Sequence, residues 1–280
     1  MRIDAHHHFW RYTAEEYGWI DDTMAAIRRD FLPSDLAGEI RSAGIDAVVS
    51  VQARQTVEET DFLLEHAAAN PWIAGVVGWL PLADPGIGAL LEEYAARPGL
   101  KGLRHVLQGE PAAYMERPDF NAGLAQLRRH NLTYDILIFH DQLPAAIALV
   151  DRHPSQVFVL DHIAKPPIRS GAMEPWATHM REMARRPNVY CKISGVVTEA
   201  DYQSWTYDQI RPYMEVALDA FAPARTMFGS DWPVCRVATT YAGWAELVER
   251  FTNALSADER DAIFRRNAMR AYNLDLKERP

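Results

Sequence analysis

The sequence has 280 residues, of which 48% are hydrophobic and 24% charged, and these proportions exclude a collagen-like, low-complexity or wholly disordered chain. A net charge of −9, from 29 basic and 38 acidic residues without a basic stripe, argues against a nucleic-acid partner. No stretch of about 18 consecutive apolar residues occurs, so we expect no transmembrane helix.

Eight short runs of apolar and β-branched residues recur along the chain, and we expect each to form a buried strand. Continuous apolar runs are typical of parallel sheets that are covered on both faces, whereas half-exposed strands alternate. The first run, residues 2–3, leads directly into three histidines. The other seven are Ala47–Val51, 73–80, 100–107, 134–139, 157–162, 189–194 and 226–230.

Segments with helix start and stop signals separate these runs. Thr56 with Glu59 predicts a capping box at the start of one helix. Ser34, Asp119 and Asp141 are the expected N-caps of three others. Further helices are expected over Tyr207–Phe221, 241–254 and 257–272.

This alternation of strand and helix, repeated eight times at intervals of roughly 25 to 45 residues, predicts an α/β protein with a single (β/α)8 TIM barrel. We expect one domain over residues 1–280, because no linker rich in Gly, Ser or Pro interrupts the chain. A doubly wound sheet is the alternative, but no glycine-rich phosphate loop follows the first strand. The aromatic-rich connection over residues 9–31 is expected to fold over the barrel mouth.

A barrel fold predicts catalytic groups at the carboxyl ends of its strands. Alternate residues of a strand point the same way, so His6 and His8 are expected to face the interior and His7 the outside. Two such imidazoles can bind a divalent metal or polarise a carbonyl group. A tag remnant or core histidines are the alternatives. We expect Asp4 to orient the His6 ring.

Later strands end in further polar residues. Asp231 follows the eighth run, and a buried carboxylate there must be paired, ligated or catalytic, unless it only fixes a loop. His162 ends the sixth run and competes with the interpretation of a core histidine. Arg104, on the fourth run, could bind a substrate carboxylate or hydroxyl group, or could form a structural ion pair.

Six short motifs follow one another along nearly the whole chain: IDAHHHFW at 3–10, LRHVLQ at 103–108, LDHIAKP at 160–166, CKISG at 191–195, MFGSDWPVC at 227–235 and NA at 267–268. Their order and spacing resemble the amidohydrolase superfamily, specifically the amidohydrolase-2 type group of sugar lactonases that includes L-fuconolactonase and L-rhamnonolactonase.

The resemblance implies a barrel hydrolase that opens a sugar-acid lactone of the L-fuconolactone or L-rhamnonolactone type. It implies His6, His8, His162 and Asp231 as metal ligands, and Asp231, His162 and His8 as catalytic residues. Binuclear members carry a carboxylated lysine or a glutamate near the end of the fourth strand, where this chain has Arg104 and His105. We therefore expect one divalent ion, with zinc or manganese best suited, or metal-free catalysis.

In the proposed reaction Asp231 takes a proton from the water that attacks the lactone carbonyl and returns it to the departing ring oxygen. In a metal-free version, Arg104 and the histidines polarise the carbonyl group. A hydroxyl-rich substrate needs several polar contacts, and the residues expected to supply them are Gln52, Arg54, Arg104, His105, Gln108, His140 and Lys192.

Other functions remain as alternatives: a different lactonase, such as the muconolactone type, a metal-dependent decarboxylase of the same superfamily, or a catalytically silent binding barrel. Cys191 and Cys235 are too few for a disulfide scaffold and predict reduced thiols in a cytoplasmic protein. The N-terminus shows no signal-peptide pattern. The expected partner is a small-molecule sugar lactone, with no nucleic acid or membrane; a homo-oligomer is compatible with the sequence.

Overall fold

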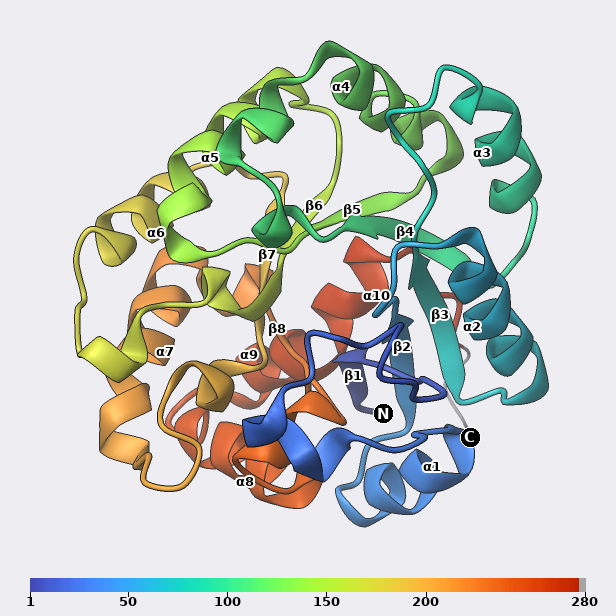
Figure 1. The fold of residues 1–280 in the computed structure, drawn as a ribbon. Helices are drawn as coiled ribbons and strands as arrows, with labels where there is room; N and C mark the ends of the chain where they lie inside the picture. The colour runs from blue at the N-terminus through green and yellow to red at the C-terminus, as the bar shows by residue number, and fades with distance from the viewer. Residues whose placement is uncertain (277–280) are drawn as a thin grey trace.

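The computed structural model describes residues 1–276, so the last four residues of the predicted 1–280 domain lie outside the described range (Figure 1). Eight strands pair in parallel and follow one another in chain order around the sheet. They are β1 (Ile3–His7), β2 (Ala47–Val51), β3 (Ile73–Gly78), β4 (Leu100–His105), β5 (Thr133–Ile136), β6 (Phe158–Leu160), β7 (Val189–Ile193) and β8 (Thr226–Phe228).

The sheet closes between its first and last strands at their carboxyl ends. The backbone N–H of Asp231 donates to the carbonyl oxygen of His6 over 2.8 Å, and the N–H of His8 donates to that of Trp232 over 2.7 Å. His7 and Trp232 form a parallel bridge at the same place. The predicted (β/α)8 barrel is therefore confirmed, and its closure runs through the histidine motif.

Helices surround the strands (Figure 1). Among the described residues, no helix is long and apolar enough to cross a membrane. Between α9 and α10 the chain passes through a single π-helical turn, Ala262–Arg266. The helices are α1 (Pro33–Ser42), α2 (Val57–Ala69), α3 (Ile87–Ala95), α4 (Pro118–Leu124), α5 (Leu143–Arg152), α6 (Trp176–Ala184), α7 (Tyr207–Phe221), α8 (Tyr241–Phe251), α9 (Ala257–Asp261) and α10 (Asn267–Ala271).

The predicted helix starts are only partly correct. The Thr56 hydroxyl accepts the N–H of Glu59 over 3.1 Å, as expected, but the Glu59 carboxylate turns away to accept the N–H of Ala53 over 2.8 Å. Ser34 is not a cap, because α1 already begins at Pro33, and the Asp35 carboxylate accepts the N–H of Leu32 over 3.0 Å. Proline fixes a helical φ and lacks an N–H, which favours it as a first helical residue.

A proline in the first turn also places the starts of the next two helices away from the predicted caps. The helix α4 begins at Pro118, one residue before the predicted cap Asp119. Asp141 lies within a 3-10 turn, His140–Gln142, and α5 follows from Leu143 with Pro144 as its second residue. The sequence therefore predicts that a helix is present more reliably than it predicts its first residue.

The core consists of two hydrophobic clusters. The larger one joins the helices to the outer face of the strands. The smaller one includes Ile3, Val49, Met227 and Tyr272, which follows α10 directly. Cys191 and Cys235 are buried free thiols, as predicted. Burial on both faces explains why the strand sequences read as continuous apolar runs.

Candidate active site

A cavity of about 470 Å³ opens at the carboxyl ends of the strands. Most of its wall is apolar, with Trp19 and Met24 contributed by the 9–31 connection, which therefore covers the mouth as predicted. The lining residues are His8, Trp19, Met24, Ala53, Arg104, Val106, Gln108, Gly109, Leu137, Phe139, His162, Lys165, Thr198, Glu199, Tyr202, Asp231 and Val234.

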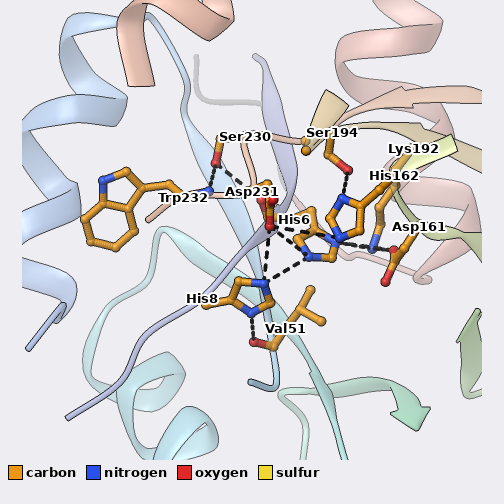
Figure 2. A network of polar contacts seen from close by, with 12 residues as sticks. His6, His8, Val51, Asp161, His162, Lys192, Ser194, Ser230, Asp231 and Trp232 are labelled. Carbon is orange, nitrogen blue, oxygen red and sulfur yellow. Dashed lines mark hydrogen bonds and ion pairs between the residues drawn. The ribbon is translucent and has the colours of Figure 1, made fainter. Parts of the chain in front are cut away.

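The histidines of β1 divide between the two faces of the barrel as expected. The Nε2 atoms of His6 and His8 lie 3.2 Å apart in the interior (Figure 2). His7 points outward, where its Nε2 lies 2.9 Å from the Ser50 hydroxyl. The prediction for Asp4 is wrong: its Oδ1 accepts the backbone N–H groups of His6 and Ser230, at 3.0 and 2.8 Å, and does not reach the His6 ring.

Asp231 brings its carboxylate to the same point from the opposite side of the barrel seam. Its Oδ1 atom lies 3.5 Å from His8 Nε2, 3.8 Å from His6 Nε2 and 4.0 Å from His162 Nε2 (Figure 2). All four residues are at least 95% buried. The four residues predicted as metal ligands thus surround one point at the bottom of the cavity.

A left-handed backbone conformation sets the direction of two of these side chains, those of His162 and Asp231. His162, Ile163, Ala164 and Lys165 all have positive φ, from 46° to 57°, and Asp231 has a φ of 56°. Each non-glycine residue in this region costs about 1–2 kcal/mol, so the surrounding contacts must hold the turn in place. The left-handed turn directs the His162 ring into the barrel, where its Nδ1 lies 2.9 Å from the Ser194 hydroxyl.

Gly195 provides the space that this arrangement needs. Its φ is +60°, and a Cβ atom there would lie 2.7 Å from His162 Nδ1 and 2.8 Å from Asp231 Oδ2. Any side chain would collide with both catalytic candidates. Glycine is therefore required by the close approach and by the positive φ together.

A buried layer of charges supports the histidines from below. Lys192 Nζ contacts Asp135 Oδ2 at 2.6 Å, Asp161 Oδ1 at 2.9 Å and His6 Nδ1 at 3.1 Å. Arg104 Nη1 donates to Asp161 Oδ2 over 2.9 Å. Two cations thus face two carboxylates, and this pairing makes burial of all four charges tolerable.

The pKa shifts follow from burial and these pairings. Burial lowers the pKa of His162 to about 4 and that of His6 well below its ordinary range. Burial opposes ionisation of Asp161, but Lys192, His6 and Arg104 together outweigh it and hold this pKa well below the usual value. For Asp231 burial is likewise outweighed, chiefly by His162, so its pKa is lowered. At neutral pH the site therefore holds an ionised Asp231 beside neutral His6 and His162 rings.

The donor atoms around Asp231 fit a divalent metal. His8 Nδ1 lies 2.8 Å from the carbonyl oxygen of Val51, so Nδ1 carries the proton and Nε2 presents a lone pair. His6 Nε2, His8 Nε2 and Asp231 Oδ1 are close enough together to hold one ion. A second group, His6, Asp161 and His162, is also close, but Lys192 and Arg104 already occupy both oxygens of Asp161.

Only some of the residues predicted to contact substrate line the cavity. Arg104 and Gln108 line the cavity, and the Oε1 atom of Gln108 is buried without a hydrogen-bond partner among residues 1–276. Gln52 is fully buried beneath them, where its Oε1 accepts from Arg104 Nη2 over 2.9 Å. Gln52 therefore orients Arg104 and is not itself part of the cavity wall.

The other four residues predicted to contact substrate do not line the cavity. Lys192 is fully buried under His6. Arg54 turns to ion pairs with Glu59 and Glu16.

His105 and His140 are likewise not part of the cavity lining. Adjacent strand residues face opposite sides, so His105 points away from Arg104 and stacks on Tyr114, with ring centroids 4.8 Å apart. His140 borders a neighbouring hollow, which shares Lys165 and Glu199 with the wall of the cavity. Sequence position at a strand end predicts proximity to the mouth but not the direction of the side chain.

Sequence reasoning assigned no role to several residues of this site. Asp161 directly precedes His162, and its position at a buried strand end was the available signal. Asp135 belongs to the fifth apolar run, where an isolated carboxylate implies a buried partner. Lys165 and Glu199 lie in connections, where no spacing rule predicts a side-chain direction.

The chain is similar to known proteins over nearly its whole length. A sequence model of the amidohydrolase family matches residues 3–274. An L-fucono-1,5-lactonase of Burkholderia multivorans is 42% identical over 98% of this chain and 96% of its own. An L-fucono-1,5-lactonase of Burkholderia ambifaria is 36% identical over 98% and 96% of the two chains.

A solved structure agrees with this similarity. A crystal structure of an amidohydrolase from Burkholderia multivorans with bound zinc superposes with a TM-score of 0.94 at 42% identity, covering 98% of this chain and all of the other.

Proposed function

Because the chain belongs to the amidohydrolase family, we propose that it is a lactonase that opens a sugar-acid lactone of the L-fucono-1,5-lactone type to the aldonate. The observation that carries the proposal is the 42% identity, over nearly the whole of both chains, to an L-fucono-1,5-lactonase. The geometry supports it, because an ionised carboxylate and the imidazoles of His6 and His8 converge at the bottom of a cavity of about 470 Å³. That volume suits a small ligand.

Asp231 is the proposed general base. Its lowered pKa keeps the carboxylate ionised at neutral pH, and it lines the cavity, so it can accept a proton from water placed against the lactone carbonyl. Attack forms a tetrahedral intermediate; its collapse breaks the bond between the carbonyl carbon and the ring oxygen. Asp231 then returns the proton to that oxygen, which leaves as a hydroxyl group, and the carboxylic acid formed releases its own proton to solvent to give the carboxylate.

Arg104 is the proposed source of fixed positive charge for the developing oxyanion. Gln52 Oε1 and Asp161 Oδ2 hold its guanidinium from two sides, each at 2.9 Å, so the charge does not need to reorganise during the reaction. His162 lies on another side of Asp231 and remains neutral, which allows it to hydrogen-bond with substrate or water.

We propose that His6, His8 and Asp231 hold one divalent ion, with His162 next to it. Zinc is the best-supported ion, because a 42% identical relative is crystallised with it and the ligands are two imidazoles and a carboxylate. When bound, the ion supplies Lewis-acid polarisation and lowers the pKa of water. The metal-free arrangement, in which the His6 Nε2–H donates to His8 Nε2, is the alternative.

The decisive experiment measures acid release from a panel of sugar lactones, with and without a chelator. We expect rapid hydrolysis of L-fucono-1,5-lactone by the purified protein. Hydrolysis of none of the sugar lactones would contradict the proposal, and release of CO2 from an aromatic acid would instead support the decarboxylase alternative. The effect of the chelator decides between the metal-dependent and metal-free forms.

A further inference from the structure

Two charged side chains that belong to neither the histidine cluster nor the buried charge layer line the cavity. Lys165 follows β6 and Glu199 follows β7, and their side chains are only 19% and 20% exposed. The Lys165 Nζ atom lies 3.8 Å from Glu199 Oε1. The two opposite charges are therefore neighbours within the wall of the cavity.

Their mutual contact leaves hydrogen-bonding capacity unused. A separation of 3.8 Å is too long for a direct hydrogen bond. Within residues 1–276, Glu199 accepts only a long hydrogen bond, 3.4 Å, from the Thr198 hydroxyl. The Lys165 ammonium lies over the Phe139 ring, 5.4 Å from its centroid, and among the described residues it donates no hydrogen bond to an oxygen. A ligand that displaces water from this part of the cavity must therefore supply hydrogen-bond partners for both charges.

Both side chains are fixed relative to the reacting groups. Lys165 ends the left-handed turn that starts at His162, and its backbone N–H donates to the His162 carbonyl oxygen over 2.8 Å. Glu199 ends the 3-10 turn Val196–Glu199, which follows Gly195 at its close approach to His162 and Asp231. A ligand group bound between Lys165 and Glu199 would therefore be held in register with Asp231.

We propose that Lys165 and Glu199 together bind neighbouring ring hydroxyls of the lactone and so determine which hydroxyl configuration is accepted. A hydroxyl group both donates and accepts, so it can donate to the Glu199 carboxylate and accept from the Lys165 ammonium. An epimer places that hydroxyl on the other face of the ring and loses one or both contacts. This inference rests on the proposed lactone hydrolysis. It identifies the configuration of the ring hydroxyls as the feature of the substrate that Lys165 and Glu199 recognise.

Three lactones distinguish recognition of ring hydroxyls from a general role in substrate binding. The 1,5-lactones of L-fuconic and L-rhamnonic acid differ only in the configuration of ring hydroxyls. The 1,5-lactone of L-galactonic acid has the ring configuration of the L-fuconic one and adds a hydroxyl outside the ring. We would measure kcat and KM on all three for the wild type, for Glu199→Gln and for Lys165→Met. Glu93→Gln, exposed on α3, and Lys101→Met, at the opposite end of β4, are the matched controls.

We expect each cavity variant to raise KM for the preferred epimer about 10- to 100-fold, the range for losing a hydrogen bond to a charged group. Because the preference between the L-fuconic and L-rhamnonic lactones rests on these contacts, it should fall at least about tenfold. The preference between the L-fuconic and L-galactonic lactones should stay the same, as should all values for the controls.

Other outcomes overturn the inference while leaving lactone hydrolysis intact. These are an unchanged epimer preference in both variants, equal wild-type activity on both epimers, or a uniform loss of kcat on all three lactones, which would indicate a purely structural pair. A wild type that hydrolyses no sugar lactone would instead contradict the proposed function itself.

Discussion

Asp231 donates its backbone N–H to the carbonyl oxygen of His6 over 2.8 Å, and its carboxylate lies 3.8 Å from the imidazole of the same histidine. This pair of residues thus contributes both to the closure of the barrel and to the candidate catalytic centre. His6 lies on the first strand and Asp231 follows the last one, so the two meet only when the sheet is complete. Precise closure of the barrel is therefore a condition for activity.

Replacement of Asp231 by asparagine tests the proposed base. The amide occupies nearly the same volume but cannot accept the proton from water, so we expect kcat/KM for L-fucono-1,5-lactone to fall about 10²- to 10⁴-fold. Acid release measures the loss, and a thermal unfolding curve checks the fold. The control is Asp219→Asn, exposed on α7. Turnover close to that of the wild type would refute the role of Asp231.

Replacement of Gly195 by alanine tests the close approach at the cavity floor. A Cβ atom would lie 2.7 Å from His162 Nδ1 at a φ of +60°, so we expect a loss of stability of about 1–2 kcal/mol from the backbone alone and a clear loss of activity. Urea unfolding and lactone hydrolysis measure the two effects. In contrast, Gly38 lies within α1 with no atom within 4 Å of its added Cβ, so Gly38→Ala should stabilise by about 0.5–1 kcal/mol. A neutral Gly195→Ala variant would contradict the geometry described above.

Metal analysis tests how many ions the site holds. Lys192 and Arg104 occupy the oxygens of Asp161, so we expect zinc to saturate at one ion per chain. Elemental analysis after zinc loading and gel filtration measures the ratio, and His8→Ala should lower it. His130→Ala, outside the cavity, is the control. A ratio of two ions per chain, or full zinc content in His8→Ala, would disprove this arrangement.

The pH dependence of stability tests the burial of His162. Its pKa is about 4 in the folded protein and 6.5 when unperturbed, so between these values the unfolded chain binds a proton that the folded protein does not. The contribution of this group therefore favours unfolding increasingly as the pH falls from 6.5 to about 4, by about 3 kcal/mol in total.

The comparison with His162→Asn isolates this effect from other titrating groups. Urea unfolding in the presence of a chelator, at several pH values across this range, should show the wild type losing stability relative to the variant as the pH falls. A constant difference between the two proteins would show that His162 titrates normally. The result does not depend on which lactone is the substrate.

The barrel and the polar residues at its carboxyl end could be predicted from the amino-acid sequence alone. Strands covered on both faces are largely apolar, so runs such as Ala47–Val51 indicate them. The alternation of side chains along a strand was enough to separate His6 and His8 from His7. The expected positions of Asp231 and His162 follow from a second rule, which is that the carboxyl ends of all strands lie at the same end of a barrel.

Which of these side chains meet depends on the folded barrel and could not be predicted from sequence position. Lys192 and His105 occupy predicted strand ends, yet one lies under the histidines and the other lies outside the barrel, because side-chain direction depends on strand register and on the charges available nearby. Lys165 and Glu199 are separated by 34 positions (199 − 165) and lie in two different connections. Their meeting depends on the left-handed turn after His162, a strained conformation that local propensity disfavours and that only the surrounding packing stabilises.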